Sequence, residues 1–510
     1  MKIFFSAFLA ICLALFSSYA MLLGSGFFSL PDWQAILIFS VFILLLSSST
    51  KSFYFLLLPF CLIYAFYTPI GITFGPPSYQ YVASIFATDL QEGKEFLSQL
   101  PFANLILAFS IIGALLAIRW LTQQFDLQFY RNRFFLAASF IVIFLATPPA
   151  KFLVEGSQAI LKVKNELERL NGMAIESQWG ESTLSATSRY DDYVLIIGES
   201  ARKDYHHAYG YPIENTPFMS HSKGILIDGL TAAGTNTIAS LKLMLTKGNT
   251  EKWEENYGLS LIDLVKSAGI RTYWISNQGY LGTFDTPISS IANKSDERFF
   301  TKSGDSFNQN VSDLTLLPKF ESVIQQPTKG KRFIVLHLYG SHPLSCDRLI
   351  DYPKMFNDEE LNPKHYNLNC YVSSIKKTDE LLQNVYQALW QNQQVSGRHF
   401  SMIYFSDHGL SHQMTEKSID LLNTSKSKLH FDVPLFKVSS DDTERHTYQA
   451  MKSGLNFTDG IANWIGIQNP KLNQEIDLFS PQADKSDYGL KALIEKIDTP
   501  ADPAITIEKK

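Results

Sequence analysis

Clusters of basic residues, internal repeats and low-complexity stretches are all missing from this sequence. Its 44 Lys and Arg residues are outnumbered by 49 Asp and Glu residues, which gives a formal net charge of −5 at pH 7. Because no basic patch stands out, nucleic acid is not an expected partner. Charged residues make up only 18% of the chain and are scarce in its first 150 residues. At 510 residues the chain is also too long for one ordinary domain, so we expect parts of different character.

Five apolar runs occupy the first 150 residues and predict a transmembrane domain. A helix that crosses the hydrocarbon core of a bilayer needs about 20 residues, with a range of about 17–25. The second and fifth runs are short, and each run alone could be a buried core helix, but five in succession with so little charge disfavour that alternative. The runs are Phe4–Gly24, Trp33–Ser48, Phe53–Ile70, Phe102–Leu121 and Phe134–Ala146.

The cations beside these runs predict how the spans are oriented. Lys2, Lys51, Arg119, Arg131 and Arg133 all fall on one side if the spans alternate, whereas the opposite loops are mostly acidic. Because positively charged loops face the cytoplasm, we expect a cytoplasmic N-terminus and everything after about residue 150 outside. The first run could also be a cleaved signal peptide, but it lacks a convincing cleavage motif.

Three segments connect or follow the larger parts of the chain. Residues 77–100 have an amphipathic pattern and predict a helix, either along the outer membrane surface or in a solvated loop. Residues 151–190 predict a linker that is helical up to Gly172 and a loop after it. Residues 191–497 are expected to form one α/β domain, and residues 498–510 a loosely ordered, flexible tail.

Three short runs in the region 191–497 predict strands of a parallel sheet. They are rich in β-branched and aromatic residues and bounded by Gly or Ser. Helix-forming segments such as Leu259–Ser267 and Tyr371–Trp390 lie between them. We therefore expect an α/β domain with a mostly parallel central sheet. The three runs are Tyr193–Ser200, Phe333–His342 and Phe400–Gly409.

Each of these predicted strands leads into a residue that can bind a metal. Glu199 follows the first strand, His342 the second, and Asp407 and His408 the third. Open α/β sheets bind ligands beyond the carboxyl ends of their strands, so these side chains are expected to converge. Two carboxylates and an imidazole suit Zn²⁺ or a similar divalent ion. Taken singly, each residue is explained as well by a turn, a salt bridge or a helix cap, and His337 is expected to be a core histidine.

The segment Thr231–Ser240, with the sequence TAAGTNTIAS, lies between a predicted strand and a helix-forming stretch. Thr237 would stand at the N-cap or in the first turn of that helix, where backbone N–H groups and the helix dipole favour an anion. Its hydroxyl is therefore either a plain helix cap or the nucleophile of an enzyme. Thr235 is the rival position, because Gly234 provides a flexible turn for either threonine.

Cysteines are few. Cys12 and Cys61 lie within apolar runs and are expected to be ordinary apolar residues. Cys346 and Cys370 lie in the part expected outside the cytoplasm, where they either form a disulfide or remain two thiols.

The order of these motifs resembles a known family. VLIIGESARKDYHHAYGYPIENTPFM, GTNT, LHLYGSH and FSDHG follow one another behind the five apolar runs. This set resembles the phosphoethanolamine transferases of Gram-negative inner membranes, which belong to the alkaline phosphatase and sulfatase superfamily. The resemblance covers nearly the whole chain and implies a five-helix transmembrane domain followed by a periplasmic α/β/α sulfatase-like domain. It also implies phosphatidylethanolamine as donor and lipopolysaccharide, at lipid A or a core sugar, as acceptor.

The resemblance implies a role for each residue that matches the family's motifs. Glu199, Asp407 and His408 would bind zinc, and Thr237 would be the nucleophile and a further zinc ligand. His342 would stabilise the substrate phosphate or help to hold a second metal ion. One zinc ion is expected, and the alternatives are a second metal ion beside it or Mn²⁺ or another divalent ion in its place.

Other positions match the family less well. His430, in KLHFDVPLF, lies near a family histidine that binds phosphate or a second metal, but two residues separate it from the Val-Pro pair. Many members flank the nucleophile with a disulfide, whereas Ala233 and Leu243 occupy those positions here. Lys242 replaces the usual proline and is either an extra cation near the phosphate or a solvated helix lysine. The family also has a cysteine pair in the general region of Cys346 and Cys370.

The implied reaction has two steps and would be carried out by a monomer. Thr237 attacks the phosphorus of phosphatidylethanolamine, diacylglycerol leaves, and the acceptor then takes phosphoethanolamine from Thr237. A glycerophosphate transferase, or a phosphodiesterase or sulfatase that releases its product to water, would share the same parts. A membrane-anchored binding or sensory protein with a decayed site is the alternative from another class.

Overall fold

The computed structural model describes residues 2–28, 30–79, 81–83, 90–129, 134, 148–172, 175–279, 286–302, 310–424, 427–497 and 499–510. The chain divides into two compact units. The first consists of Met1–Phe86 and Gly93–Asn165, and the second of Ala87–Glu92 and Glu166–Lys510.

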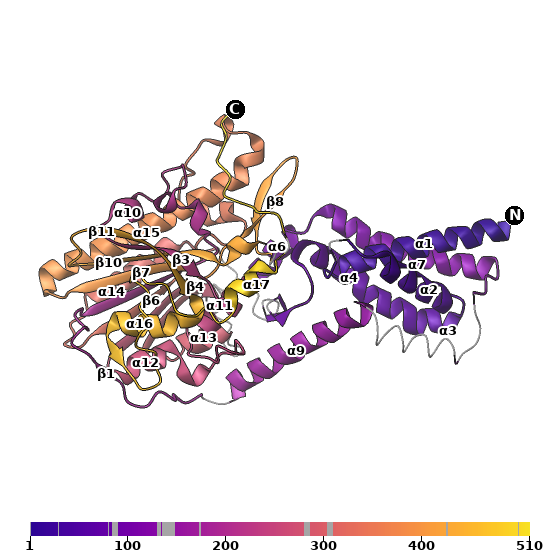
Figure 1. Ribbon diagram of the computed structural model, residues 1–510. Helices are drawn as coiled ribbons and strands as arrows, with labels where there is room; N and C mark the ends of the chain where they lie inside the picture. The colour runs from indigo at the N-terminus through magenta and orange to yellow at the C-terminus, as the bar shows by residue number, and fades with distance from the viewer. Residues whose placement is uncertain are drawn as a thin grey trace. The chain divides into compact units, whose positions relative to one another are not determined.

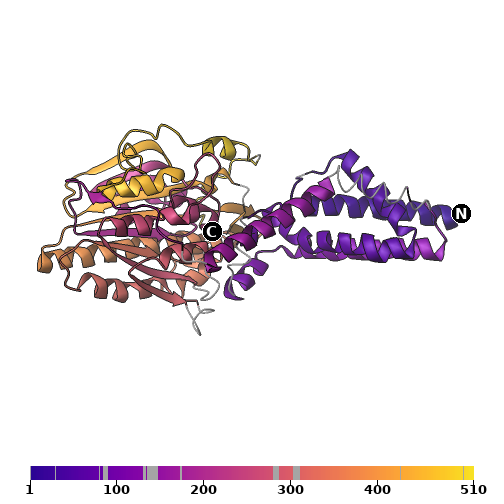
Figure 2. The same cartoon turned by 90° about the horizontal axis from the view of Figure 1, so that it is seen from below.

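Apolar helices that lie side by side build the first unit (Figures 1 and 2). Within the described residues, three helical stretches are long and apolar enough to cross a membrane: Lys2–Gly24, Thr50–Phe74 and Phe102–Gln124. They correspond to the first, third and fourth predicted runs. The helix Trp33–Ser47 has 15 residues, which is short for a simple crossing. The fifth run lies almost entirely outside the described residues, so five spans stay a prediction.

The helices from the N-terminus to the start of the second unit have the following bounds. They are α1 (Lys2–Gly24), α2 (Trp33–Ser47), α3 (Thr50–Ser52), the π-helix η1 (Phe53–Leu57), α4 (Leu58–Phe74), α6 (Leu90–Ser98), α7 (Phe102–Gln124) and α9 (Pro148–Gly172). Of the segment 77–100, the structure thus describes a helix in its second half. Nearly all of α9 lies within the predicted linker, residues 151–190, and the helix ends at Gly172 as the glycine stop signal indicates.

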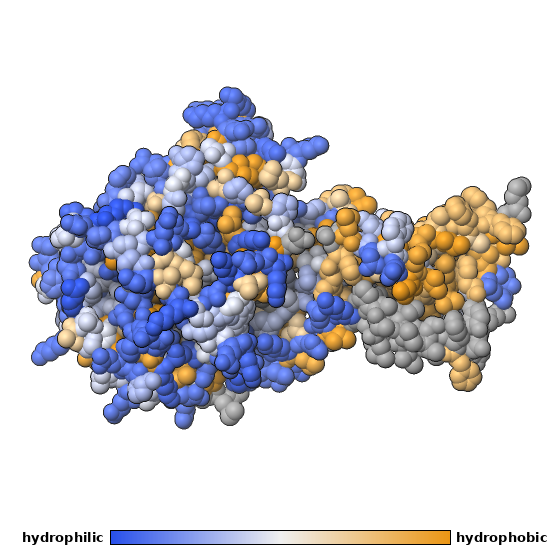
Figure 3. Space-filling model, in the orientation of Figure 1, coloured by the Kyte–Doolittle hydropathy of each residue, from blue (hydrophilic) through white to orange (hydrophobic). Residues whose placement is uncertain are grey.

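The outer surface of the first unit is apolar. On the face drawn in Figure 3, this unit is mostly hydrophobic wherever its residues are coloured, whereas the second unit is mostly hydrophilic. Phe4, Phe55, Phe66 and Phe109 are all more than 70% exposed. Exposed apolar side chains gathered in this way are typical of a protein that faces lipid.

Arg119 is buried in the first unit rather than placed in a loop. The side chain projects from α7, is 5% exposed, and donates a hydrogen bond to the carbonyl oxygen of Ser47 at 2.9 Å. Its guanidinium lies 5.9 Å from the ring centroid of Phe53. Arg119 therefore satisfies a carbonyl group at the C-terminal end of α2, which the charge pattern alone does not reveal.

An eight-stranded sheet forms the centre of the second unit, in the order β11-β3-β10-β7-β2-β6-β4-β5. Neighbouring strands are parallel, except that β10 is antiparallel to β3 and to β7. The predicted mostly parallel sheet is therefore confirmed. The central strands β2 (Asp192–Gly198), β6 (Arg332–His337) and β7 (Phe400–Ser406) are fully buried, which explains why they read as unbroken apolar runs.

Helices cover both faces of this sheet and form a three-layered α/β/α unit (Figures 1 and 2). Side chains of α11, α12, α13 and α16 pack against one face. Side chains of α10, α14 and α15 pack against the other face. The two layers hold the central strands rigidly, so the residues after each strand lie at a fixed edge.

The remaining elements of the second unit have the following bounds. The helices are α10 (Pro217–His221), α11 (Thr237–Met244), α12 (Leu261–Ser267), α13 (Pro287–Ala292), α14 (Leu317–Ile324), α15 (Tyr366–Ser396), α16 (Phe457–Ile465) and α17 (Leu490–Glu495). The strands are β1 (Thr183–Leu184), β3 (Gly224–Thr231), β4 (Arg271–Gly279), β5 (Glu297–Lys302), β8 (Ser411–Met414), β9 (Ile419–Leu422), β10 (Asp432–Ser439), β11 (Arg445–Ser453) and β12 (Ile467–Gln468). The short 3-10 helices are η2 (Lys203–Tyr205), η3 (His207–Tyr209), η4 (Tyr257–Leu259), η6 (Asp313–Leu316), η7 (Ser345–Leu349), η8 (Asp358–Glu360), η9 (Pro363–His365), η10 (Lys428–His430) and η11 (Gly454–Asn456).

Residues 499–510 differ from the loose tail that the sequence predicts, because they lie against the second unit. The amide of Ile505 donates to the Tyr205 hydroxyl at 3.1 Å, and the Tyr211 hydroxyl donates to the Ile505 carbonyl at 2.8 Å. Ile505 and Ile507 pack against a buried cluster that includes both tyrosines. The segment therefore packs against the domain.

Candidate active site

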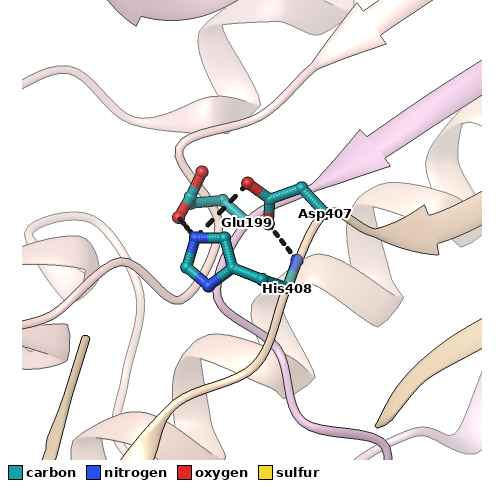
Figure 4. A group of neighbouring side chains, drawn as sticks. All are labelled: Glu199, Asp407 and His408. Atoms are coloured by element: carbon teal, nitrogen blue, oxygen red, sulfur yellow. Dashed lines mark hydrogen bonds and ion pairs between the residues drawn. The ribbon is translucent and has the colours of Figure 1, made fainter. Parts of the chain in front are cut away.

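The carboxyl ends of β2 and β7 bring three ionisable side chains together. Gly198 and Ser406 are paired in register, so the residues that follow them, Glu199 and Asp407, emerge side by side. One ligand atom from each of Glu199, Asp407 and His408 lies within 4.8 Å of the other two (Figure 4). All three side chains are at most 1% exposed. The convergence expected at the strand ends is thus present for these residues.

The loop after β7 orients the His408 imidazole. Its Nδ1 lies 2.7 Å from the carbonyl oxygen of Gly409, so Nδ1 carries the donated proton and Nε2 faces the carboxylates. Nε2 lies 3.2 Å from Glu199 Oε1 and 3.5 Å from Asp407 Oδ2. The backbone N–H groups of His408 and Ser200 donate to Asp407 Oδ1 at 2.7 and 3.1 Å, which leaves Oδ2 to a ligand.

Two atoms of this cluster that make no hydrogen bond among the described residues fit a divalent cation. Among the described residues, Asp407 Oδ2 and His408 Nε2 are buried and make ion-pair contacts but no hydrogen bond. Burying polar atoms in this way is costly unless a further partner satisfies them. Two carboxylates and an imidazole nitrogen that has released its proton are donors that zinc and similar ions accept. Glu199, Asp407 and His408 could therefore hold such an ion.

The charges of the three side chains compensate one another. Burial would lower the pKa of His408, but Asp407 and Glu199 raise that pKa to about 9. Burial would raise the pKa of Glu199, but the His408 charge holds it well below its usual range. Burial and the charge of Glu199 together raise the pKa of Asp407. The site therefore concentrates negative charge that needs a positive partner, which a bound cation would also supply.

Thr237 is the first residue of α11, and its side chain contacts the cluster. The N-cap is Asn236, whose side chain accepts from the Ala239 amide at 2.8 Å, so the capping role considered for Thr237 belongs to its neighbour. The Thr237 hydroxyl instead donates to Glu199 Oε2 at 2.8 Å. This contact favours Thr237 over Thr235 as the residue that acts at the cluster.

Several residues that the sequence analysis did not single out hold Glu199 in place. Ser200 has a φ of 57°, a left-handed conformation that is uncommon outside glycine, and its hydroxyl donates to Glu199 Oε1 at 2.7 Å. A Cβ added to Gly340 would lie 2.8 Å from the Glu199 amide nitrogen, so only glycine fits there. Gln278 Nε2 donates to the Leu338 carbonyl at 2.7 Å and lies 3.4 Å from Glu199 Oε2. Nothing in a single sequence marks Gln278 or Gly340 as supports of Glu199.

Two further predicted residues lie close to the cluster. The His430 ring stacks on the His408 ring with 6.5 Å between centroids, and neither of its nitrogens has a hydrogen-bond partner among the described residues. Burial, followed by the positive charge of His408, lowers the pKa of His430 well below its usual value. His342 stacks on Tyr339 at 4.7 Å, and its charge helps to lower the pKa of Glu199.

Lys242 takes neither of the positions expected for it. Its Nζ lies 3.4 Å from Glu166 Oε1 and 3.1 Å from Glu255 Oε2, and the residue is 4% exposed. The ammonium group is thus buried between two carboxylates rather than solvated. Because those carboxylates already neutralise it, Lys242 is a poor candidate for a phosphate contact.

His337 and the cysteine pair Cys346 and Cys370 lie outside the cluster of metal-ligand type. His337 lies inside β6, its ring is edge-on to Trp274 at 5.8 Å, and burial lowers its pKa to about 4, as suits a neutral core histidine. Cys346 and Cys370 form a disulfide with an S–S distance of 2.06 Å, which joins η7 to α15.

The sequence of this chain matches known proteins over most of its length. The Sulfatase family model matches residues 191–467. A Haemophilus influenzae protein named "Putative phosphoethanolamine transferase" is 57% identical over 414 residues, which cover 81% of this chain and 85% of that protein. Phosphoethanolamine transferase OpgE of Escherichia coli is 30% identical over 463 residues, which cover 86% of this chain and 84% of OpgE. The chain therefore belongs to the sulfatase family and, within it, to the phosphoethanolamine transferases.

A solved structure supports the fold of the whole chain. The integral membrane lipooligosaccharide phosphoethanolamine transferase A (EptA) of Neisseria meningitidis aligns with a TM-score of 0.61 at 15% identity. The alignment covers 92% of this chain and 98% of EptA. At this identity the likeness concerns the fold alone, namely apolar N-terminal helices followed by an α/β sulfatase-like domain.

Proposed function

We propose that the protein transfers phosphoethanolamine from phosphatidylethanolamine to a lipopolysaccharide acceptor, at lipid A or a core sugar. The observation that carries this proposal is the 2.8 Å hydrogen bond from Thr237 to Glu199, beside Asp407 and His408. In a member of this family, a hydroxyl held against a cluster of metal-ligand type is the arrangement expected of a nucleophile.

The proposal assigns a divalent ion, zinc in the first place, to Glu199, Asp407 and His408, with the Thr237 hydroxyl as a further donor. When bound, such an ion lowers the pKa of a hydroxyl and neutralises charge on phosphate oxygens. Its fit rests on the two buried atoms, Asp407 Oδ2 and His408 Nε2, that make no hydrogen bond among the described residues. His430 and His342 would contact the substrate phosphate or help to hold a second ion.

The first step forms a bond between Thr237 Oγ1 and the phosphorus of the donor. The bond from phosphorus to the diacylglycerol oxygen breaks at the same centre, and diacylglycerol leaves as an alcohol after taking up a proton. The proton that Thr237 loses balances the one that the diacylglycerol oxygen takes up, and Glu199 Oε2, whose pKa is lowered, accepts the hydrogen bond that orients the hydroxyl. Backbone N–H groups at the start of α11 favour the phosphodiester anion on Thr237.

The second step reverses these roles on the acceptor. A hydroxyl or phosphate oxygen of the acceptor attacks the phosphorus, the bond to Thr237 Oγ1 breaks, and the threonine hydroxyl regains a proton. Little acid or base strength is needed, because transfer of a phosphoryl group depends mainly on position and charge neutralisation.

The apolar first unit suits a donor that is itself a membrane lipid. A hydrolase that acted on soluble substrates would have no need of it. The distribution of cations supports an orientation with a cytoplasmic N-terminus and a periplasmic catalytic domain. The proposal is of an inner-membrane protein that acts as a monomer.

The test is to express the wild type, Thr237→Ala and Thr235→Ala in a Gram-negative host and to analyse lipid A and core oligosaccharide by mass spectrometry. We expect added phosphoethanolamine with the wild type and Thr235→Ala, and none with Thr237→Ala. Addition that persists in Thr237→Ala would show that the nucleophile is wrong. A glycerophosphate adduct would indicate a glycerophosphate transferase, and unchanged glycans with the wild type would contradict the proposed acceptor.

A further inference from the structure

The C-terminal segment, residues 499–510, binds to the turn that follows Glu199. Asp502 Oδ2 lies 3.2 Å from an Arg202 guanidinium nitrogen, and Arg202 also donates to the Asp502 carbonyl oxygen at 2.6 Å. The Ser427 hydroxyl donates to the other carboxylate oxygen, Oδ1, at 2.6 Å. The His412 amide also donates to Asp502 Oδ2 at 3.4 Å, and His412 Nδ1 lies 3.8 Å from the same oxygen. Asp502 is thus held by Arg202, His412 and Ser427, all far away in the sequence.

Arg202 lies between the two loops that carry the candidate metal ligands. It stands three residues after Glu199 and is 0% exposed. Its guanidinium lies 3.4 Å from the carbonyl oxygen of Leu410, two residues after His408. A Cβ added to Gly409 would lie 2.9 Å from Arg202 Cγ, so the side chain packs directly against the loop that orients His408.

The charge of Arg202 is balanced by two carboxylates of different origin. Burial would lower the pKa of Arg202, but Asp204 and then Asp502 raise it. Asp204 belongs to the same turn as Arg202 and binds it at 2.6 Å, whereas Asp502 comes from a segment 300 residues away. A buried cation that loses one of its counter-charges is strongly destabilised and must move or admit water. Arg202 therefore depends on the C-terminal segment for its position.

We propose that Asp502 is a positioning residue for the metal site. By holding Arg202 in place, it fixes the backbone at Gly409 and Leu410, and the Gly409 carbonyl in turn orients the His408 imidazole at 2.7 Å. Residues that orient a ligand through such a hydrogen bond typically contribute about 10–100-fold to metal affinity. The inference rests on the proposed function, because it assumes that His408 binds the metal ion.

The experiment is a zinc titration of the full-length protein in detergent micelles, in competition with a chromogenic chelator. The variants are Asp502→Asn, which removes the charge, and Asp502→Glu, which keeps it. Asp441→Asn is the matched control. Like Asp502, Asp441 pairs with an arginine, and it accepts a hydrogen bond from a tyrosine. It follows the C-terminal end of β10, away from the metal ligands. We expect about tenfold weaker zinc binding for Asp502→Asn, partial recovery for Asp502→Glu and no change for Asp441→Asn.

A second variant covers the case in which Asp502→Asn does not fold. Ser427→Ala removes one contact to Asp502 and leaves every charge in place, so we expect a smaller loss of zinc affinity at an unchanged melting temperature. Zinc binding equal to the wild type in whichever of these two variants is folded would overturn the inference. A wild type that binds no zinc would instead refute the proposed metal site, and the inference with it.

Discussion

The Thr237 hydroxyl donates a hydrogen bond to Glu199 Oε2 across 2.8 Å, although the two residues are 38 positions apart. Glu199 leaves the end of β2, and Thr237 opens α11 with its side chain released from capping by Asn236. The hydroxyl proposed as the nucleophile is therefore already in contact with the proposed metal cluster.

Two substitutions at Thr237 separate its hydroxyl from its shape. Thr237→Val keeps the branched side chain but has no oxygen, so we expect transfer to fall by at least about 1000-fold. Thr237→Ser keeps the oxygen and is expected to retain measurable transfer, reduced because serine is less restricted at χ1. The measurement is the initial rate with labelled phosphatidylethanolamine, with Thr235→Val as control. Wild-type rates for Thr237→Val would exclude the hydroxyl as nucleophile.

Removal of the metal is expected to abolish transfer, and zinc to restore it. Glu199→Gln and Asp407→Asn each remove one carboxylate charge from the cluster. Zinc affinity should therefore fall by more than about 100-fold, which is more than the loss expected when a residue that only orients a ligand is replaced. Metal analysis and titration check this, with the exposed Glu214→Gln as control. Full activity of protein that contains no metal would contradict the assignment.

Lys242 is expected to matter for stability rather than for substrate binding. Burial would raise the pKa of Glu255, but Lys242 lowers it, so Lys242→Met removes a cation that Glu166 and Glu255 share. Arg169 still contacts Glu255 at 3.3 Å. Breaking a buried pair in this way costs about 3–5 kcal/mol of unfolding free energy. Denaturant unfolding tests this, with the more exposed Lys266→Met as control. A raised KM for the donor at unchanged stability would favour a phosphate contact instead.

Two buried histidines are expected to make the catalytic domain sensitive to acid. Burial lowers the pKa values of His206 and His337 to about 4, from about 6.5 in the unfolded chain. Unfolding therefore takes up protons between these values, so their stabilisation is complete above pH 6.5 and is lost as the pH falls towards 4. Each contributes up to about 1.4 kcal/mol per pH unit within that window.

The measurement is denaturant unfolding of the full chain at several pH values between 4 and 7. His337→Leu is expected to reduce the number of protons taken up on unfolding by one, and so to reduce the slope of the unfolding free energy against pH. Replacement of the exposed His221 should leave that slope unchanged. An unchanged slope in His337→Leu would show that this histidine is not neutral in the folded protein.

The central site was accessible from sequence because of the way buried parallel strands are built. Such strands must be apolar throughout, so the first polar residues after them mark one edge of the sheet. Glu199, Asp407 and His408 follow from this rule when the strand ends are taken together, but so does His342, which is not one of the three grouped side chains. Thr237 needed more, because the sequence left open whether its hydroxyl caps the helix or acts as a nucleophile, with Thr235 as a rival. Only the structure shows that Asn236 is the N-cap.

Positions that depend on distant partners could not be predicted in this way. The sequence around Lys242 is typical of a solvated helix residue. The residue is buried because it pairs with Glu166 and Glu255 on other segments. Residues 499–510 have the composition of a loose tail, yet Arg202 binds Asp502 within them. In both cases a charge far away in the sequence determines the local structure.

The most direct test of the account is to look for the covalent intermediate. The wild type is incubated with phosphatidylethanolamine in the absence of acceptor, quenched and digested, and its peptides are analysed by mass spectrometry. We predict phosphoethanolamine on Thr237, absent in Thr237→Val and lost when acceptor is added. Transfer that proceeds with no modified peptide, or with the group on another residue, would contradict the central claim.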